Sequence, residues 1–225
     1  MSNTNSKNTK EILVIALKLL VICSIVATII AAVNAITKDK IKYNEQLKTA
    51  DALSEIYSLD FDNKSFTVDG EEYVILENDN KTVVARCSLA DCSYINEDIK
   101  ALYVLKDANG NSKGYCVSIE PMGFKDAIKM LVAVNDDMTV KSVKIVSMSE
   151  TKNYGTRAMN DPTPPAGKAS STWFLEQFEG KNEPGIQSAD IISGATKTSK
   201  PIINAVQTAL NQVNVYNNTI GGNSK

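Results

Sequence analysis

The sequence predicts an α+β protein, in which a single N-terminal transmembrane helix is followed by a β-rich domain that ends in a C-terminal helix. An uncharged apolar stretch near the start of the chain has the length of a membrane span. Short β-rich runs separated by polar turns fill the middle, and apolar residues at helical spacing mark the end. The expected organisation is 1–37 for the N-terminal segment and transmembrane helix, 38–60 for a helical stalk, 61–216 for the folded domain and 217–225 for a flexible tail.

The predicted membrane helix is the run between Lys18 and Lys38, which contains 19 residues without a charge. As an α-helix this run would span about 28 Å, close to the hydrocarbon thickness of a bilayer. A cleaved signal peptide is the alternative, because the small residue Ala35 lies where a peptidase could cut. We favour an uncleaved anchor, since the run is longer than a typical signal core and a helical pattern follows it. Lysines lie on both sides of the run, so charge does not choose an orientation.

Beyond the span, the pattern changes from helical to β-rich. The stalk is expected to be helical, with an apolar side made of Ile41, Leu47, Ala50, Leu53 and Tyr57. The last helix is expected to begin near Pro201, a residue suited to a first helical turn. A short helix is expected near "STWFLEQF". The expected strands are 71–77, 81–86, 101–107, 113–120, 124–134 and 139–149.

Composition excludes several kinds of chemistry. The chain has no histidine, which removes Ser-His and Cys-His nucleophile pairs and imidazole metal sites. Its net charge is −2 with scattered Lys and Arg, so no nucleic-acid partner is expected. Cys87 and Cys92 lack the CxxC spacing of metal sites, which leaves a small disulfide loop or plain buried thiols. Chemistry must therefore come from carboxylates, hydroxyls, thiols, backbone amides or a bound cofactor.

The motif with the most chemical content is "SADIISGATKTSKP", residues 188–201, directly before the last helix. A helix N-terminus offers free backbone N–H groups and a partial positive charge, which together attract phosphate. Gly194 and Ala195 have no bulk to hold a phosphate away. The motif adds hydroxyl groups at Ser193, Thr196, Thr198 and Ser199. Ordinary helix capping without any ligand is the alternative from these residues alone.

Residues 190–196, "DIISGAT", resemble the D-x-x-[S/T]-G-A-[T/S] signature of the FMN-binding domain family, which is found in the RnfG protein of Rnf complexes and the NqrC protein of Nqr complexes. In that family a flavin transferase, using FAD and Mg²⁺, esterifies the final hydroxyl residue with FMN phosphate. The resemblance implies that Thr196 carries covalent FMN and that Asp190 helps to present it to the transferase. It also implies cofactor-binding roles in the turn for Ser193, Gly194, Ala195 and Thr198.

A second segment, "MSETKNYG" at 148–155, resembles the family's H-x-E-T-P-G-L-G-like segment. Glu150, Thr151 and Gly155 are in register, which implies that they contact the cofactor. Residues 152–154 replace the Pro-Gly-Leu of the family, and Ser149 or a neighbour stands at the histidine position. Tyr154 has two open interpretations: a ring that stacks on the flavin, or a loop aromatic without such a role.

The resemblance implies a function as well as a cofactor. It implies an electron-carrier component of an ion-translocating ferredoxin:NAD oxidoreductase (an Rnf complex), without turnover of its own. Its partners would be other integral membrane, iron–sulfur and flavin subunits, and a flavin transferase during maturation. The flavin domain would face the extracytoplasmic side of the cell membrane, where a Cys87–Cys92 disulfide is chemically possible. Two alternatives stay open: a cofactor-free membrane-tethered binding module, and a flavin domain of another membrane respiratory system.

Overall fold

The structure is a computed structural model that describes residues 3–58, 76–77, 83–86, 95–107, 109 and 111–221. The chain divides into two units between Lys48 and Thr49. The elements in chain order are α1 (Asn3–Tyr57), β1 (Leu76–Glu77), β2 (Val83–Arg86), β3 (Ile99–Lys106), β4 (Ser112–Ile119), β5 (Lys129–Val134), β6 (Val140–Ser147), the 3₁₀ helix η1 (Gly155–Ala158), α2 (Trp173–Glu176), α3 (Glu183–Ile186) and α4 (Thr196–Gly221).

The first unit is the part of α1 up to Lys48. Its residues Glu11–Lys38 are long and apolar enough to cross a membrane, and none of the side chains in the most apolar window is buried. Two hydroxyl groups bond within the helix itself, since Thr28 Oγ1 and Thr37 Oγ1 each donate to a carbonyl four residues earlier, at 2.8 Å. An apolar surface with its polar groups satisfied internally is what a bilayer requires of a helix.

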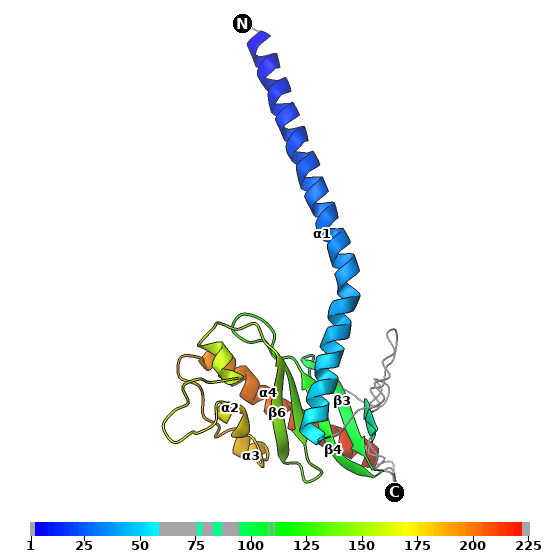
Figure 1. The fold of residues 1–225 in the computed structure, drawn as a ribbon, viewed down its shortest axis with the longest axis vertical. Coiled ribbons are helices and arrows are strands. Elements are labelled where there is room, and N and C mark those ends of the chain that lie inside the picture. Colours follow the sequence, from blue (N-terminus) through cyan, green and yellow to red (C-terminus); the bar gives the residue numbers. More distant parts are fainter. Residues whose placement is uncertain are drawn as a thin grey trace. The chain divides into compact units, whose positions relative to one another are not determined.

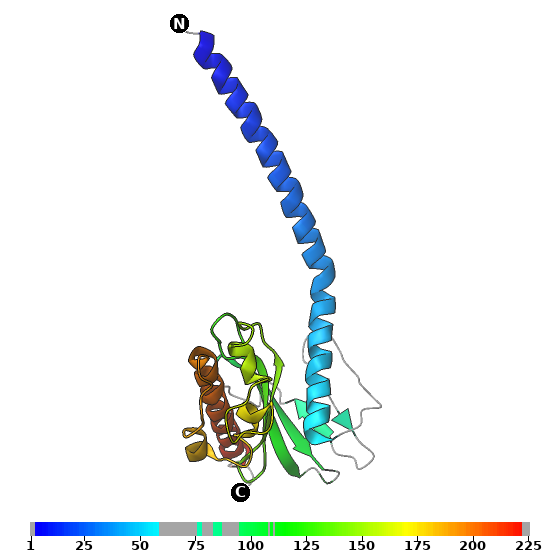
Figure 2. The ribbon, with the colours of Figure 1, turned by 60° about the vertical axis from the view of Figure 1, so that its left-hand side comes forward.

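The second unit is built on an antiparallel meander in the order β1-β2-β3-β4-β5-β6 (Figure 1). Register is continuous through its centre, where Val117 pairs with Val132 and Val132 with Val143. The middle strands β4 and β5 are buried on both faces, because helices cover both sides of the sheet. Figure 2 shows α4 on one face and the last turns of α1 on the other.

Alternate residues of the strands belong to two separate cores. Val117 and Val132 point toward α4, which contributes a buried stripe made of Ile202, Ala205, Val206, Ala209, Leu210 and Val213. Their neighbours Cys116 and Leu131 point the other way, toward the end of α1. This division follows from the two-residue period of a strand.

The end of the predicted stalk packs as part of the domain. Ala50 and Leu53 are fully buried. The Tyr57 hydroxyl donates a hydrogen bond to the Tyr115 carbonyl at 2.8 Å in the buried layer. The apolar side expected for the stalk is therefore buried at Ala50, Leu53 and Tyr57, where it covers one face of the sheet. The same expectation was wrong at Ile41, which is exposed, and Leu47 is half-buried.

Helix α4 begins at Thr196, five residues before the predicted start near Pro201, so that prediction was wrong. The Ala195 carbonyl accepts the N–H groups of Thr198 and Ser199 at 3.0 and 2.9 Å, which closes the first turn. Pro201 lies inside the helix, where its missing N–H forfeits only one bond, to the Lys197 carbonyl. The helix continues to Gly221, so residues 217–221, which we expected in the tail, extend it.

Strand β5 starts at Lys129, so the expectation of a strand from residue 124 was wrong at its first half. Residues 121–128 instead form a tight loop, in which the Gly123 N–H donates to the Asp126 carbonyl at 2.9 Å. The remaining expected strands and the helix at 173–176 are present in the described residues. Parts of the first two expected strands, at 71–75 and 81–82, lie outside those residues, as do Cys87 and Cys92.

Candidate functional site

The two segments singled out in the sequence face each other across one pocket of about 320 Å³. This volume lies at the lower end of the range for small-molecule sites. One wall, which we call the first wall, is Glu150–Gly155, and the second wall is Gly194–Thr198. The pocket is lined by Phe124, Glu150, Thr151, Tyr154, Gly155, Gly194, Ala195, Thr196, Lys197 and Thr198.

The second wall is a turn that leads into α4. Gly194 has a φ of +78°, a left-handed conformation that favours glycine. A Cβ at this position would also lie 3.6 Å from Tyr154 Cδ1 on the opposite wall. The turn closes when the Ala195 N–H donates to the Ile192 carbonyl at 2.9 Å. The chain therefore reverses tightly at Gly194 and starts a helix two residues later.

The N-terminus of α4 has the donor set that a phosphate group requires. The N–H groups of Thr196 and Lys197 have no acceptor among the residues that the structure describes, as is usual in a first helical turn. The Thr196 side chain is exposed, and its hydroxyl likewise makes no hydrogen bond to the described part of the chain. Lys197 adds a positive charge, and its Nζ lies 5.3 Å from the Phe124 ring centroid. This end of the pocket suits an anion.

The base of the pocket is a buried hydrogen bond between the walls. Thr198 is 2% exposed, and its Oγ1 donates to Glu150 Oε2 at 2.8 Å. The other carboxylate oxygen accepts the Lys125 N–H at 3.0 Å. Glycine at 155 makes this packing possible, because a Cβ there would lie 2.6 Å from Glu150 Oε2. The Thr198 hydroxyl is thus already committed to the opposite wall.

The residues expected to bind the cofactor lie together in the pocket, except Ser193, and Asp190, which was expected to act in recognition by the transferase, also lies outside it. Ser193 lies just outside the second wall, and its carbonyl accepts Arg157 Nη1 at 3.3 Å. Asp190 lies on the surface, with Oδ2 3.6 Å from Lys168 Nζ. Gln177 holds the backbone of Asp190, since it accepts the N–H at 2.7 Å and donates to the carbonyl at 3.1 Å.

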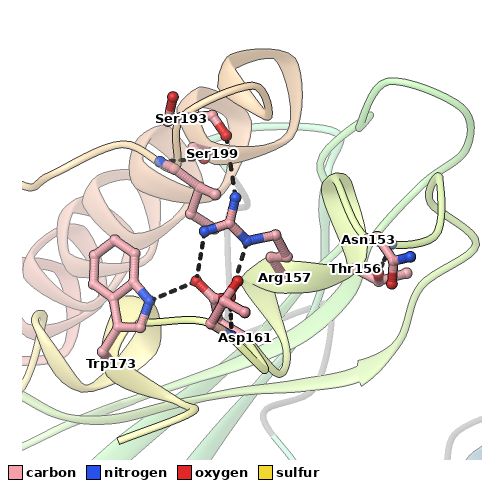
Figure 3. A network of polar contacts seen from close by, with 9 residues as sticks. Asn153, Thr156, Arg157, Asp161, Trp173, Ser193 and Ser199 are labelled. Atoms are coloured by element: carbon pink, nitrogen blue, oxygen red, sulfur yellow. Dashed lines mark hydrogen bonds and ion pairs between the residues drawn. The ribbon is translucent and has the colours of Figure 1, made fainter. Parts of the chain in front are cut away.

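A polar network beside the pocket was missed in the sequence (Figure 3). Its centre is Asp161, which is fully buried and accepts Arg157 Nε and Nη2, both at 2.9 Å. Asp161 also accepts Trp173 Nε1 at 3.0 Å and the Thr163 N–H at 3.0 Å. The hydrogen bonds from the Arg157 guanidinium are the main reason that the pKa of Asp161 falls to about 2.

The sequence carried only weak signals for these residues. The i,i+4 spacing of Arg157 and Asp161 is that of a helical ion pair, but the segment has the Pro and Gly content of a loop. Phe124 was placed in a strand, whereas it lies in a loop that reaches the pocket. Within the described ranges, no group of acidic or cysteine side chains could hold a metal ion.

Comparison with family models connects the pocket to a known class of domain. Residues 123–211 match the model described as FMN-binding domain, and residues 1–56 match the model described as RnfG N-terminal region. Every residue that lines the pocket falls within the first of these matches. The second match covers the apolar helix and its continuation into the domain.

Relatives extend the similarity over most of the chain. The G subunit of an ion-translocating oxidoreductase complex from Vibrio atlanticus is 25% identical over 199 residues, 85% of each chain. The protein of the same name from Vibrio vulnificus is 21% identical over 197 residues, 85% of this chain and 84% of the relative. The G subunit of a proton-translocating ferredoxin:NAD(+) oxidoreductase complex from Clostridium ljungdahlii is 35% identical over 103 residues, 45% of this chain and 54% of the relative.

Proposed function

We propose that this chain, which belongs to the RnfG family of proteins with an FMN-binding domain, is a membrane-anchored electron carrier with FMN covalently linked to Thr196. The family makes it a component of an ion-translocating oxidoreductase complex. FMN binding follows from the matching domain. The covalent link, the membrane anchor, the orientation and the identity of the partners are the proposal.

The observation that carries the proposal is the position of the Thr196 hydroxyl. Of the four hydroxyl residues singled out in the motif, Ser199 is fully buried and does not line the pocket, and the other three differ in access. Ser193 is exposed but does not line the pocket, and Thr198 lines the pocket but is buried and bonded to Glu150. Thr196 alone among these three is both exposed and pocket-lining, at the end of a helix that attracts phosphate.

Attachment would exchange the phosphoanhydride linkage of FAD for a phosphoester linkage to Thr196. The Thr196 oxygen would form a bond to the FMN-side phosphorus of FAD, the pyrophosphate bond would break, and AMP would leave with the bridging oxygen. The hydroxyl proton would pass to the transferase. The free N–H groups of Thr196 and Lys197 would hold the phosphate oxygens, and Tyr154 and Phe124 offer aromatic faces to the ring system. FMN, when bound, supplies reversible electron transfer.

The attachment test compares matched hydroxyl variants of the full chain, co-expressed with a flavin transferase. The wild-type mass should rise by that of FMN less one water, and a denaturing gel should fluoresce under ultraviolet light. We expect Thr196→Ala to lose both signals, while Thr196→Ser and Ser193→Ala keep them. Covalent flavin on Thr196→Ala would overturn the assignment. An unmodified wild type, with a transferase active on a positive control, would favour a cofactor-free module in which the motif is a helix cap.

Asp190 is proposed as a recognition residue for the transferase, because its carboxylate is exposed beside the attachment loop. We expect Asp190→Asn to slow modification without unfolding the domain. Lys168→Ala is the matched control, since it removes the same surface ion pair and keeps the carboxylate. Equal rates for Asp190→Asn and wild type, measured by mass over time, would remove this role.

The anchor and its orientation form a separate part of the proposal. The apolar helix of 28 residues, Glu11–Lys38, would span the cell membrane once and place the flavin domain on the extracytoplasmic side beside its partner subunits. We expect the chain to stay with membranes after a carbonate wash. A protease added to spheroplasts should then remove the domain. Protection of the domain in spheroplasts, with digestion after lysis, would reverse the orientation.

A further inference from the structure

The two walls of the pocket are tied to each other at two places. At the base, Thr198 on the second wall donates to Glu150 on the first wall, at 2.8 Å. Beside the pocket, Arg157 donates to the carbonyl of Ser193, the residue directly before the second wall, at 3.3 Å. We call the Thr198–Glu150 bond the base tie and the Arg157–Ser193 bond the rim tie. Arg157 belongs to η1, which begins at Gly155, the last residue of the first wall. The rim tie therefore joins the same two segments as the base tie.

The rim tie is held rigidly from behind by Asp161. The carboxylate binds the Nε and Nη2 atoms of Arg157 in a fork, which leaves Nη1 directed at the Ser193 carbonyl (Figure 3). Asp161 is itself fixed by the indole N–H of Trp173, a residue of the core. A planar guanidinium held at two points has little freedom left at its third donor.

We propose that Arg157 is a positioning residue for the flavin: it fixes the second wall against the first wall and so immobilises the cofactor carried by Thr196. The Ser193 carbonyl belongs to the peptide plane that leads into Gly194, so the tie restrains the backbone where the chain turns left-handed. Thr196 follows two residues later. Without the rim tie, the bond from Thr198 to Glu150 would be the remaining hydrogen bond between the two segments in the described part of the chain.

This role concerns how the flavin is held and not whether it is attached. The inference rests on the proposed function, because it needs flavin on Thr196. The proposed function and this inference can be tested separately, since attachment is measured by mass and immobilisation by spectroscopy. Arg157 does not line the pocket, so it acts through the Ser193 backbone and not by contact with the cofactor.

The experiment uses the flavinylated full chain with Arg157→Gln and Arg157→Lys. Fluorescence anisotropy of the attached flavin reports its mobility, and iodide quenching reports its access to solvent. The chain unfolded in urea, with flavin still attached, defines the mobile limit. Lys168→Ala is the control, because Lys168 pairs with the same loop at Asp190 without joining the walls. Thermal unfolding is measured on every sample.

We expect Arg157→Gln to carry full FMN mass, with anisotropy shifted toward the mobile limit and iodide quenching raised severalfold. Arg157→Lys should fall between Arg157→Gln and wild type, because lysine keeps the charge beside Asp161 but has no fork. Lys168→Ala should match wild type in both optical signals.

Two results would overturn the inference while leaving attachment intact. In one, Arg157→Gln shows a lower melting temperature with wild-type anisotropy and quenching, which would make the network purely structural. In the other, the wild-type flavin is already at the mobile limit. Should Arg157→Gln not fold, Arg157→Lys decides alone, by whether its anisotropy differs from wild type. A wild type without FMN mass would instead overturn the proposed function.

Discussion

Two buried carboxylates support the walls of the pocket, Glu150 at its base and Asp161 beside it, and they are satisfied in opposite ways. Asp161 is 0% exposed and faces a cation, since two of its hydrogen bonds come from Arg157. Glu150 is 8% exposed and accepts from neutral donors, the Thr198 hydroxyl and the Lys125 N–H. Both carboxylates tie the walls of the pocket, one through a charged group and the other through a hydroxyl.

This difference predicts which of the two contacts tolerates a substitution of its carboxylate. A guanidinium has only donors, so its partner must remain an acceptor at every contact. A hydroxyl donates or accepts by rotating, so the base tie can adapt to a changed partner. The Asp161 pair therefore serves as a fixed element of the fold, and the Glu150 pair is an adaptable contact inside the pocket.

The largest effect is expected for Asp161→Asn. The amide keeps the size of the side chain but places an N–H₂ group against Arg157 and removes the charge that compensates it. We expect a loss of about 3 kcal/mol in unfolding free energy, at the low end for a broken buried pair because Arg157 is partly exposed. Urea denaturation followed by the single tryptophan measures it. The exposed Asp136→Asn is the control, and equal losses for both would refute the comparison.

Acid should weaken the same pair. The Arg157 hydrogen bonds lower the pKa of Asp161 from 3.8 to about 2, so the unfolded chain binds a proton at a higher pH than the folded chain. This contribution to stability is complete above about pH 4 and is lost as the pH falls toward 2. We expect wild type to lose more stability than Asp161→Asn over that interval. Parallel curves for both proteins would contradict it.

A smaller loss of stability is expected for substitutions of Glu150, and we expect the amide variant to lose less than the alanine variant. Glu150→Ala leaves the buried Thr198 hydroxyl without its acceptor and removes the acceptor of the partly buried Lys125 N–H, which should cost about 1–3 kcal/mol. Glu150→Gln should recover most of this, because the Thr198 hydroxyl can turn to accept from the amide. Urea titration of both variants provides the measurement. Equal losses in Gln and Ala would show that the charge itself is required.

The smallest effect is expected for Lys168→Ala. Its ion pair with Asp190 is 3.6 Å long, and the two side chains are 40% and 69% exposed. Solvent screening leaves such pairs with little net stabilisation. We expect a change within about 0.5 kcal/mol, measured by the same titration. A loss comparable to that of Asp161→Asn would mean that exposure does not separate the two aspartates.

The strands were predictable where they carry a strong local pattern, and the loops were not. The runs that became β3, β4 and β6 consist of β-branched and aromatic residues between turn signals. Residues 124–128 were expected to form the first half of the strand at 124–134 but form a loop, because the Gly123 N–H bonds to the Asp126 carbonyl before β5 begins. The start of α4 was misplaced for a similar reason. Its first turn is closed by backbone hydrogen bonds to the Ala195 carbonyl, which have no sequence signature.

Most of the candidate site was predictable because it consists of two short motifs, each contiguous in sequence. The resemblance of both motifs to one family implied that Glu150, Gly155, Gly194 and Thr196 lie at one site, and all four line the pocket. Nothing in either motif shows that the Thr198 hydroxyl is hydrogen-bonded to Glu150, or that Ser193 lies outside the pocket. Those distinctions depend on which side of a turn each side chain faces.

The sequence by itself determined the elements that depend on local order: an apolar helix, a series of short strands, and a small-residue turn before an amphipathic helix. Hydrophobic periodicity and backbone permissiveness are properties of neighbouring residues, so they can be read directly from the chain. Only the tertiary structure decided which hydroxyl is free, which carboxylate meets a cation, and that Arg157 reaches Ser193. The Arg157–Ser193 and Thr198–Glu150 contacts join residues that are 36 and 48 positions apart. Arg157 and Asp161 are close in sequence, but Asp161 also bonds to Trp173, which belongs to α2. They exist because α4 and η1 pack into the same hydrophobic core, which brings two distant segments together.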